Sequence, residues 1–146
     1  ISESIPLGTL KNYADTLDTL RDPNVFFVMR GCIGGCSKIK PTIAFVQSIL
    51  TINEKKRRVA EVQIDPFLFQ TYGIKHVPAI AYAHGVKTAN SELSEGLAKN
   101  LKAKPTATVL YGDVSLQYAI EKINVQIKSK RLTLMAKALG ATSYEQ

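Results

Sequence analysis

The sequence predicts an α/β fold in which helices flank a central mixed sheet. Short apolar segments of strand length alternate along the chain with longer segments whose apolar residues are spaced by three or four. Glycine, proline and aspartate separate these segments. The resulting order, β-α-β-α-β-α-β-β-α, favours strands that gather into one sheet and helices that cover it.

Length and composition agree with a folded chain. The 146 residues are 45% hydrophobic and 21% charged, which is enough to bury a core unaided. We expect a single domain over residues 1–146, with a core of about 1–127 and a helical tail at 128–146. Apolar runs such as Val25–Met29 are far shorter than the ~20 residues that a membrane-spanning helix needs. Because the chain begins with Ile1, it is either a mature product or an artificially trimmed chain, and we expect that a signal peptide has been removed.

The first half of the chain predicts two helices around a strand. Leu7–Arg21 has one apolar face, and Val25–Met29 is an uninterrupted apolar run typical of a strand buried on both faces. Gly31–Ser37 is a glycine-containing turn with both cysteines, and Ile39–Ile52 follows as a second helix. The residues expected on the buried side of this helix are Ile43, Val46, Ile49 and Leu50.

The middle of the chain predicts a strand and a short helix. The cations Lys55–Arg58 suit a helix C-terminus, so we expect the second helix to end there. Val59–Ile64 alternates well enough for a strand. Asp65 can cap a short helix with Pro66 at its first position, and Gly73 is a suitable stop.

The last third predicts a hairpin followed by two helical segments. Pro78–Ala83 and Ala107–Tyr111 are typical of strands, and Val86–Thr106 between them enlarges the hairpin region. Ser115–Ile127 is a helix capped by its first residue. Arg131–Leu139 has apolar residues at helical spacing and either completes the core or forms an amphipathic arm for a partner.

The two cysteines are the first candidate site. Cys32 and Cys36 flank Ile33–Gly35 between the buried strand and the second helix, where a helix N-terminus favours thiolate. The spacing leaves three interpretations open: a structural disulfide, a redox-active pair, or two free thiols. A disulfide here closes a small loop and contributes roughly 2 kcal/mol in the chain-entropy model.

The second candidate is the proline that begins the next strand. Pro78 follows His76 and Val77, and a strand's first position suits a residue that cannot donate to a ladder. The sequence alone favours a trans bond, because only about 5% of X–Pro bonds are cis. His76 and His84 lack metal-ligand spacing, and the chain has no glycine-rich phosphate loop. We therefore expect neither a metal nor a cofactor.

The chain is basic, with 19 Lys and Arg against 12 Asp and Glu and a net charge of +7. The cations gather at Lys55–Arg58, Lys99–Lys104 and Lys128–Arg131. Solvated helix ends and a surface for an anionic partner both fit this pattern. Few aromatic residues lie between the cations, so the stacking platform of a single-strand binder is missing and we do not expect nucleic acid as a partner.

Taken together, residues Val25–Ile123 resemble a thioredoxin fold. Cys36 is followed five residues later by Pro41, as in thioredoxins, and Tyr72–Pro78 resembles the stretch that leads into their cis-proline. Tyr111–Ser115 resembles the glycine turn before their last helix. The resemblance implies that the bond before the strand's proline is cis and that this proline lies beside the cysteine loop.

A narrower resemblance covers nearly the whole chain and rests on an ordered set of short segments. They are Ser4–Pro6, Met29–Gly31, Ile64–Pro66, Phe69, Tyr72–Pro78 and Gly112–Leu116. This set is similar to the TrbC family of F-type conjugation systems. The resemblance implies a periplasmic component of a type IV secretion apparatus, needed for pilus assembly and associated with TraW. In the oxidising periplasm, Cys32 and Cys36 would be disulfide-bonded.

The chain departs from the thioredoxin enzymes at the cysteine motif. Three residues separate its cysteines instead of two, and aligning on Cys36 puts Ile33 where the attacking cysteine would be. The aromatic residue before the motif is absent, and Phe26–Arg30 offers no buried acid. We therefore expect a non-catalytic assembly protein with a TraW-like partner.

The alternative is a thiol–disulfide oxidoreductase or isomerase that serves the same apparatus. In that case Cys32, which we expect to face solvent, attacks a substrate disulfide and Cys36 resolves the intermediate. Val77 and Pro78 would then line the substrate groove.

Overall fold

The computed structural model describes residues 1–84 and 106–142, and within these ranges the chain is a mixed α/β structure. This confirms the predicted class. The enlarged hairpin region expected at Val86–Thr106 lies, except for its last residue, outside the described residues. The elements are α1 (Leu7–Leu20), β1 (Phe27–Met29), α2 (Ile39–Leu50), β2 (Thr51–Asn53), β3 (Lys56–Arg57), β4 (Val62–Ile64), α3 (Pro66–Thr71), β5 (Ala79–His84), β6 (Thr106–Tyr111), α4 (Leu116–Ile127) and α5 (Lys130–Thr142).

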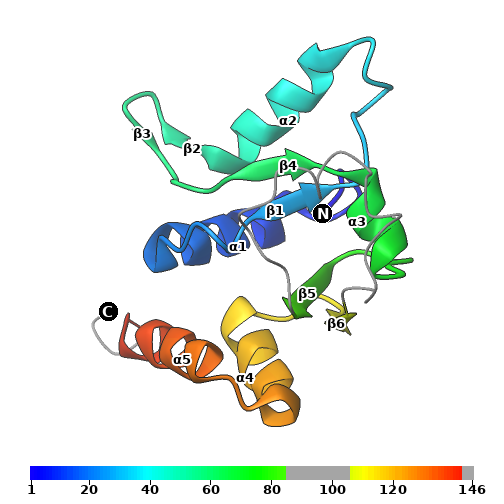
Figure 1. Cartoon of the computed structure of the whole chain (residues 1–146). Helices are drawn as coiled ribbons and strands as arrows, with labels where there is room; N and C mark the ends of the chain where they lie inside the picture. The colour runs from blue at the N-terminus through cyan, green and yellow to red at the C-terminus, as the bar shows by residue number, and fades with distance from the viewer. Residues whose placement is uncertain (85–105, 143–146) are drawn as a thin grey trace.

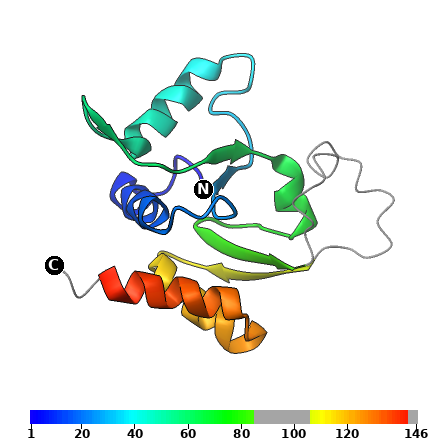
Figure 2. The ribbon, with the colours of Figure 1, turned by 60° about the vertical axis from the view of Figure 1, so that its left-hand side comes forward.

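The strands form three separate two-stranded sheets. β1 pairs with β4 in parallel, β5 pairs with β6 in antiparallel fashion, and β2 and β3 form a small hairpin. Figures 1 and 2 both show β1 and β4 in the middle of the molecule, between α2 and the β5–β6 pair. The one continuous central sheet of the sequence prediction is therefore not formed by the described strands, because no ladder joins β1 to β5.

Two helices begin with the side-chain caps that the sequence predicted. The carboxylate of Asp65 accepts hydrogen bonds from the N–H groups of Phe67 and Leu68, at 2.9 and 3.2 Å, and Pro66 takes the first position of α3. The hydroxyl of Ser115 accepts from the N–H of Tyr118 at 3.2 Å at the start of α4. Each cap satisfies an N–H group that the helix itself leaves free.

The end of α2 differs from the prediction. The helix stops at Leu50, and the segment expected to finish it instead enters the β2–β3 hairpin. The guanidinium of Arg58 then returns to donate to the carbonyls of Ile49 and Thr51, at 3.1 and 3.4 Å. A cation, Arg58, therefore does lie at the C-terminus of the helix. It reaches this position through the β2–β3 turn, which the charge pattern did not indicate.

The buried face of α2 is narrower than the periodicity indicated. Ile49 is fully buried, whereas Ile43 is 47% exposed. In the next segment the strand starts only at Val62, and Val59 before it is 60% exposed. The apolar stripe of α2 is wider than the surface that the neighbouring elements cover, so part of it stays at the surface.

The C-terminal helix α5 packs on the same core as α1 and α4. Figure 2 shows α4 and α5 side by side beyond β6, and residues of all three helices belong to one buried cluster. Of the two interpretations of the tail, completion of the core is the one that the structure supports. The buried members from these helices are Leu10, Tyr13, Ala14, Leu17, Leu116, Ile120, Ile123, Leu132 and Leu139.

Candidate functional site

The two cysteines are joined by a disulfide in the loop between β1 and α2. The Cα atoms of Cys32 and Cys36 are 5.0 Å apart, within the usual range for a bridge. Gly34 and Gly35 have φ values of +69° and +91°, which residues with a side chain rarely adopt. The N–H of Gly35 donates to the carbonyl of Cys32, and that of Lys38 donates to the carbonyl of Gly35. The free-thiol interpretation is therefore wrong.

The exposure of the two cysteines is the reverse of the expectation. Cys32 is half-buried and Cys36 is exposed, although we expected Cys32 to face solvent. Cys32 lies three residues after Met29, the buried last residue of β1. Cys36 comes after the two glycines, on the outer part of the loop.

A threonine that sequence reasoning missed holds the loop to α2. Thr42 is only 3% exposed, and its hydroxyl accepts a hydrogen bond from the N–H of Ile33 at 2.9 Å. A donor between the two cysteines is thereby satisfied by the helix that follows them. One signal was present in the sequence: Thr42 and Ile49 are seven residues apart and therefore share the inward face of the helix.

Val77 and Pro78 lie at the start of β5 and are joined by a cis peptide bond, as the thioredoxin resemblance implied. Both are half-buried, and Val77 packs against the core. The carbonyl of Pro78 accepts from the N–H of Gly112 at 3.0 Å, which extends the β5–β6 ladder by one step. The proline therefore occupies the position before the strand proper, where its missing donor is not needed.

A cavity of about 560 Å³ lies between the two larger sheets. One wall is formed by Phe27 and Val28 of β1 and by Phe26, the residue before the strand. The opposite wall is formed by Ala79–Ala83 of β5, and apolar side chains of α1, α3, α4 and α5 lie around both walls. We call this cavity the inter-strand groove. Val77 and Pro78 line it, whereas Cys32 and Cys36 do not. The structure thus brings two of the four predicted site residues to the groove and leaves the disulfide outside it.

Charge is sparse along the groove. Among the described residues that line it, the basic groups are the amino group of Ile1 and the guanidinium of Arg131. The amino group donates to the carbonyl of Val28 at 2.6 Å, and its burial lowers its pKa from 8.0 to about 6. Tyr13 contributes a neutral phenol that donates to the carbonyl of Val114 at 2.8 Å. The groove is therefore an apolar site with polar groups at few points.

Comparison with known families agrees with the narrower resemblance. A family model described as type-F conjugative transfer system pilin assembly protein, F-type TrbC, matches residues 1–123. The chain belongs to this family. The match includes the disulfide loop, the strand that follows Pro78 and most of α4. No curated protein and no solved structure matches the chain significantly.

Two further observations describe the TrbC chain over residues 1–84 and 106–142. In these ranges no helix is long and apolar enough to cross a bilayer. The same residues contain no group of three or more His, Cys, Asp or Glu placed to hold a metal ion. His76 is exposed and meets the ring of Tyr111 edge-on, with the ring centroids 6.2 Å apart.

Proposed function

We propose that this TrbC protein is a non-catalytic periplasmic component of an F-type conjugative type IV secretion system. It acts in pilus assembly by binding a TraW-like protein of the same apparatus. The observation that carries the proposal is the family match together with an apolar groove that stands apart from the disulfide. A protein that works by contact needs a surface of this kind, whereas a thiol enzyme needs its cysteines at the binding site.

The position of the cysteines supports a structural role for their bond. Thiol–disulfide exchange needs an attacking thiolate beside the bound polypeptide. Neither cysteine lines the groove in this chain, and aligning Cys36 with the thioredoxin enzymes puts Ile33 where the attacking cysteine would be. The bond is instead one element of a loop fixed by backbone turns and by Thr42.

The disulfide also supports the proposed compartment. Such bonds persist in oxidising environments, among them the bacterial periplasm, and are rare in the cytosol. A role in pilin assembly is consistent with that compartment.

The proposal is tested by co-purification of the full chain with the TraW-like protein of the same conjugation system. We expect stable capture by the wild-type chain and by the double variant Cys32→Ser/Cys36→Ser, once circular dichroism shows that the variant is folded. We also expect this variant to restore pilus assembly in cells that lack the protein. Failure of the wild-type chain to capture the TraW-like protein would contradict the partner.

The thiol–disulfide alternative gives a different set of results. It requires that the wild-type chain reduce insulin or reactivate scrambled ribonuclease, and that the double serine variant lose both activities. It also requires that a folded, partner-binding serine variant fail to restore pilus assembly. We expect no disulfide exchange above the background rate with either chain.

A further inference from the structure

The wall of the inter-strand groove formed by β1 is a strand edge. The N–H of Phe27 donates to Glu61 and the carbonyl of Met29 accepts from Asp65, so these two residues direct their backbone groups toward β4. Alternate residues of a parallel strand direct these groups to opposite sides. Val28 therefore faces the groove, and its carbonyl does meet the Ile1 ammonium on that side.

The opposite wall, formed by β5, is also a strand edge. The bond from Gly112 to Pro78 and the register Ala79↔Tyr111 fix which residues face β6. In an antiparallel ladder, alternate residues exchange hydrogen bonds with the partner strand and those between them direct their groups outward. The outward set is Ala79, Ala81 and Ala83, all of which line the groove. Among the described strands, none pairs with β5 on this side.

These walls place two demands on whatever fills the groove. The surrounding side chains are almost all apolar, so the occupant must supply apolar surface. The β5 edge presents the donors and acceptors of Ala79, Ala81 and Ala83, whereas the β1 edge presents the N–H of Val28, whose carbonyl already accepts from Ile1. Donors and acceptors that are buried without partners cost free energy. A hydrocarbon chain meets the first demand alone. An extended polypeptide meets both, because its backbone repeats donors and acceptors at the spacing of a strand.

We propose that the inter-strand groove binds an extended apolar segment of a partner protein, which is added as a β-strand between β1 and β5. The inference rests on the proposed function and deepens it by naming the chemistry of the partner segment. The stretch Ala79–Ala83 can pair with about five residues, or roughly 16 Å of strand.

The composition of the segment follows from its surroundings. Apolar side chains of α1, α4 and α5 border the groove, so an uninterrupted apolar run suits it better than alternating apolar and polar residues. The charged side chain in the described lining is Arg131, a cation that also pairs with Asp22, and the chain as a whole carries +7. The amino group of Ile1, with a pKa of about 6, is mostly uncharged at neutral pH. Acidic residues beside the apolar run therefore complement the groove, and basic residues there oppose binding.

The direct test uses a capped peptide of about five consecutive Val and Ile residues flanked by Glu, a length set by the strand rise along the groove. We expect the full chain to bind it. Ala81→Pro removes a donor that faces the groove and not β6, so the β5–β6 ladder keeps its bonds. We expect this variant to bind the peptide at least about tenfold more weakly, the effect of one or two lost backbone hydrogen bonds. The control Ala81→Val keeps the donor and should retain binding.

Two measurements keep the test decisive if Ala81→Pro fails to fold. The first is a peptide with an N-methyl group on its central residue, which should bind the wild-type chain at least about tenfold more weakly. The second is amide exchange in the free chain, where Ala81 should exchange at least about tenfold faster than its neighbour Ile80, whose N–H faces β6. Added peptide should slow Ala81 to the rate of Ile80.

Several outcomes would overturn the inference. Equal protection of Ala81 and Ile80 in the free monomer means that β1 and β5 already pair in solution. Protection of Ala81 that appears only as the chain dimerises assigns the groove to a second copy. Displacement of the peptide by palmitate, with palmitate binding unaffected by Ala81→Pro, assigns it to hydrocarbon.

Different results would contradict the inference about the groove and the proposed function. Peptide binding that depends on Ala81, without capture of the TraW-like protein, supports the groove and contradicts that partner. Capture of the TraW-like protein by Ala81→Pro and wild-type chains alike, without peptide binding, supports the function and overturns the groove.

Discussion

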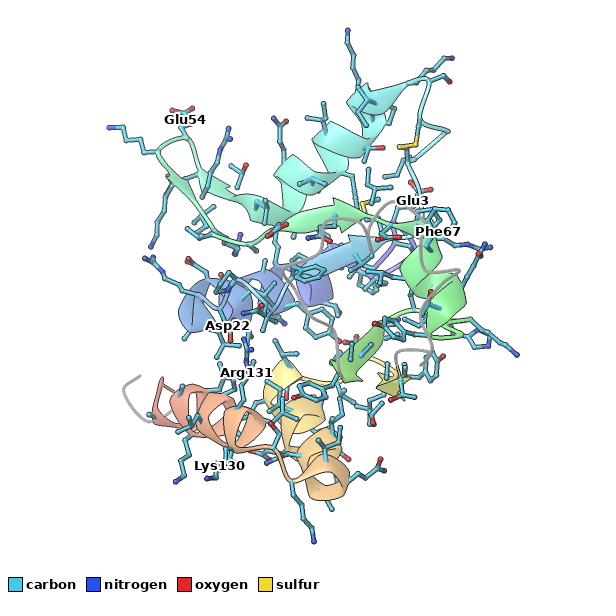
Figure 3. All side chains as sticks on the ribbon, viewed as in Figure 1. Glu3, Asp22, Glu54, Phe67, Lys130 and Arg131 are labelled. Atoms are coloured by element: carbon cyan, nitrogen blue, oxygen red, sulfur yellow. A yellow bond between two sulfur atoms is a disulfide. The ribbon has the colours of Figure 1, made fainter. Side chains whose placement is uncertain are left out.

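One guanidinium nitrogen of Arg131 donates to both carboxylate oxygens of Asp22, at 2.6 Å each, across 109 residues of sequence. Figure 3 shows the two side chains pointing toward one another from α5 and from the turn between α1 and β1. Asp22 also accepts from the N–H of Asn24 at 2.9 Å. Because Arg131 lines the inter-strand groove, the pair fastens the C-terminal helix across one side of it.

Loss of this ion pair should destabilise the chain modestly. We expect Arg131→Gln to lower the free energy of unfolding by about 1 kcal/mol, since the pair is only partly shielded from water. Lys130→Gln is the matched control, because Lys130 is exposed and Figure 3 shows it directed away from Asp22. Urea denaturation at neutral pH measures both variants. Equal changes in the free energy of unfolding would show that stability responds to the loss of one positive charge and not to the loss of the ion pair.

The same pair should give the stability a dependence on acid. Burial alone would raise the pKa of Asp22, but hydrogen bonds from Arg131 and Asn24 outweigh it and hold the pKa below 3.8. A carboxylate with a lowered folded-state pKa stabilises the fold above its unfolded-state value, and that contribution is lost as pH falls through the folded-state pKa. We therefore expect Asp22→Asn to be less stable than wild type at neutral pH, and the difference to shrink at pH values below about 4. A difference that stays constant through this acid range would contradict the assignment.

A second buried contact joins α1 to the turn before α4. The phenol of Tyr13 donates to the carbonyl of Val114, and burial, with the nearby charge of Asp113, raises the pKa of Tyr13 above 10.0. We expect Tyr13→Phe to cost about 1 kcal/mol, whereas Tyr118→Phe, at a 45% exposed position, should cost little. Because the folded-state pKa is raised, the phenol's contribution is present below pH ~10 and is lost as pH rises through the folded-state value. Difference absorbance during alkaline titration should therefore show that the phenol signal removed by Tyr13→Phe belongs to pH values above 10.

Much of the fold could be predicted from the sequence because it depends on local interactions. The caps Asp65 and Ser115 and the stop at Gly73 depend on residues within a few positions, so the sequence placed them correctly. The bounds of α1 and α4 followed from apolar periodicity for the same reason. In contrast, four successive cations favoured a helix end at Lys55–Arg58, where the chain in fact makes a hairpin.

Long-range contacts could not be predicted. The pair of Asp22 with Arg131 and the bond from Tyr13 to Val114 join residues more than a hundred positions apart, and neither position shows a local pattern. The sequence identified Val77 and Pro78 but not the groove that they line, because that groove exists only where β1 and β5 fail to pair. The thioredoxin-like fold stays a prediction, because the described strands do not join β1 to β5 in one sheet.

The hydroxyl group of Thr42 should contribute more to the stability of the chain than the volume of the side chain does. Thr42→Val keeps the shape but leaves the N–H of Ile33 without its acceptor, which should cost about 1–3 kcal/mol. Thr42→Ser keeps the hydroxyl and loses only a methyl group, so it should cost less. Thermal unfolding of the oxidised chains compares them. If the valine variant is the more stable of the two, packing of the methyl group outweighs the hydrogen bond at this position.

The conformation of the disulfide loop can be tested by one substitution repeated at two glycines. Gly35 has a φ of +91°, so an added Cβ is strained even though no atom lies within 4 Å of it, and Gly35→Ala should destabilise the oxidised chain by about 1–2 kcal/mol. Gly8 lies in the first turn of α1, again with open space around it, and Gly8→Ala should stabilise the chain by about 0.5 kcal/mol. Urea denaturation under oxidising conditions measures both. Opposite signs show that backbone conformation decides the result, since the free space is alike at both positions, whereas a stabilising Gly35→Ala would mean that the loop adopts an ordinary φ in solution.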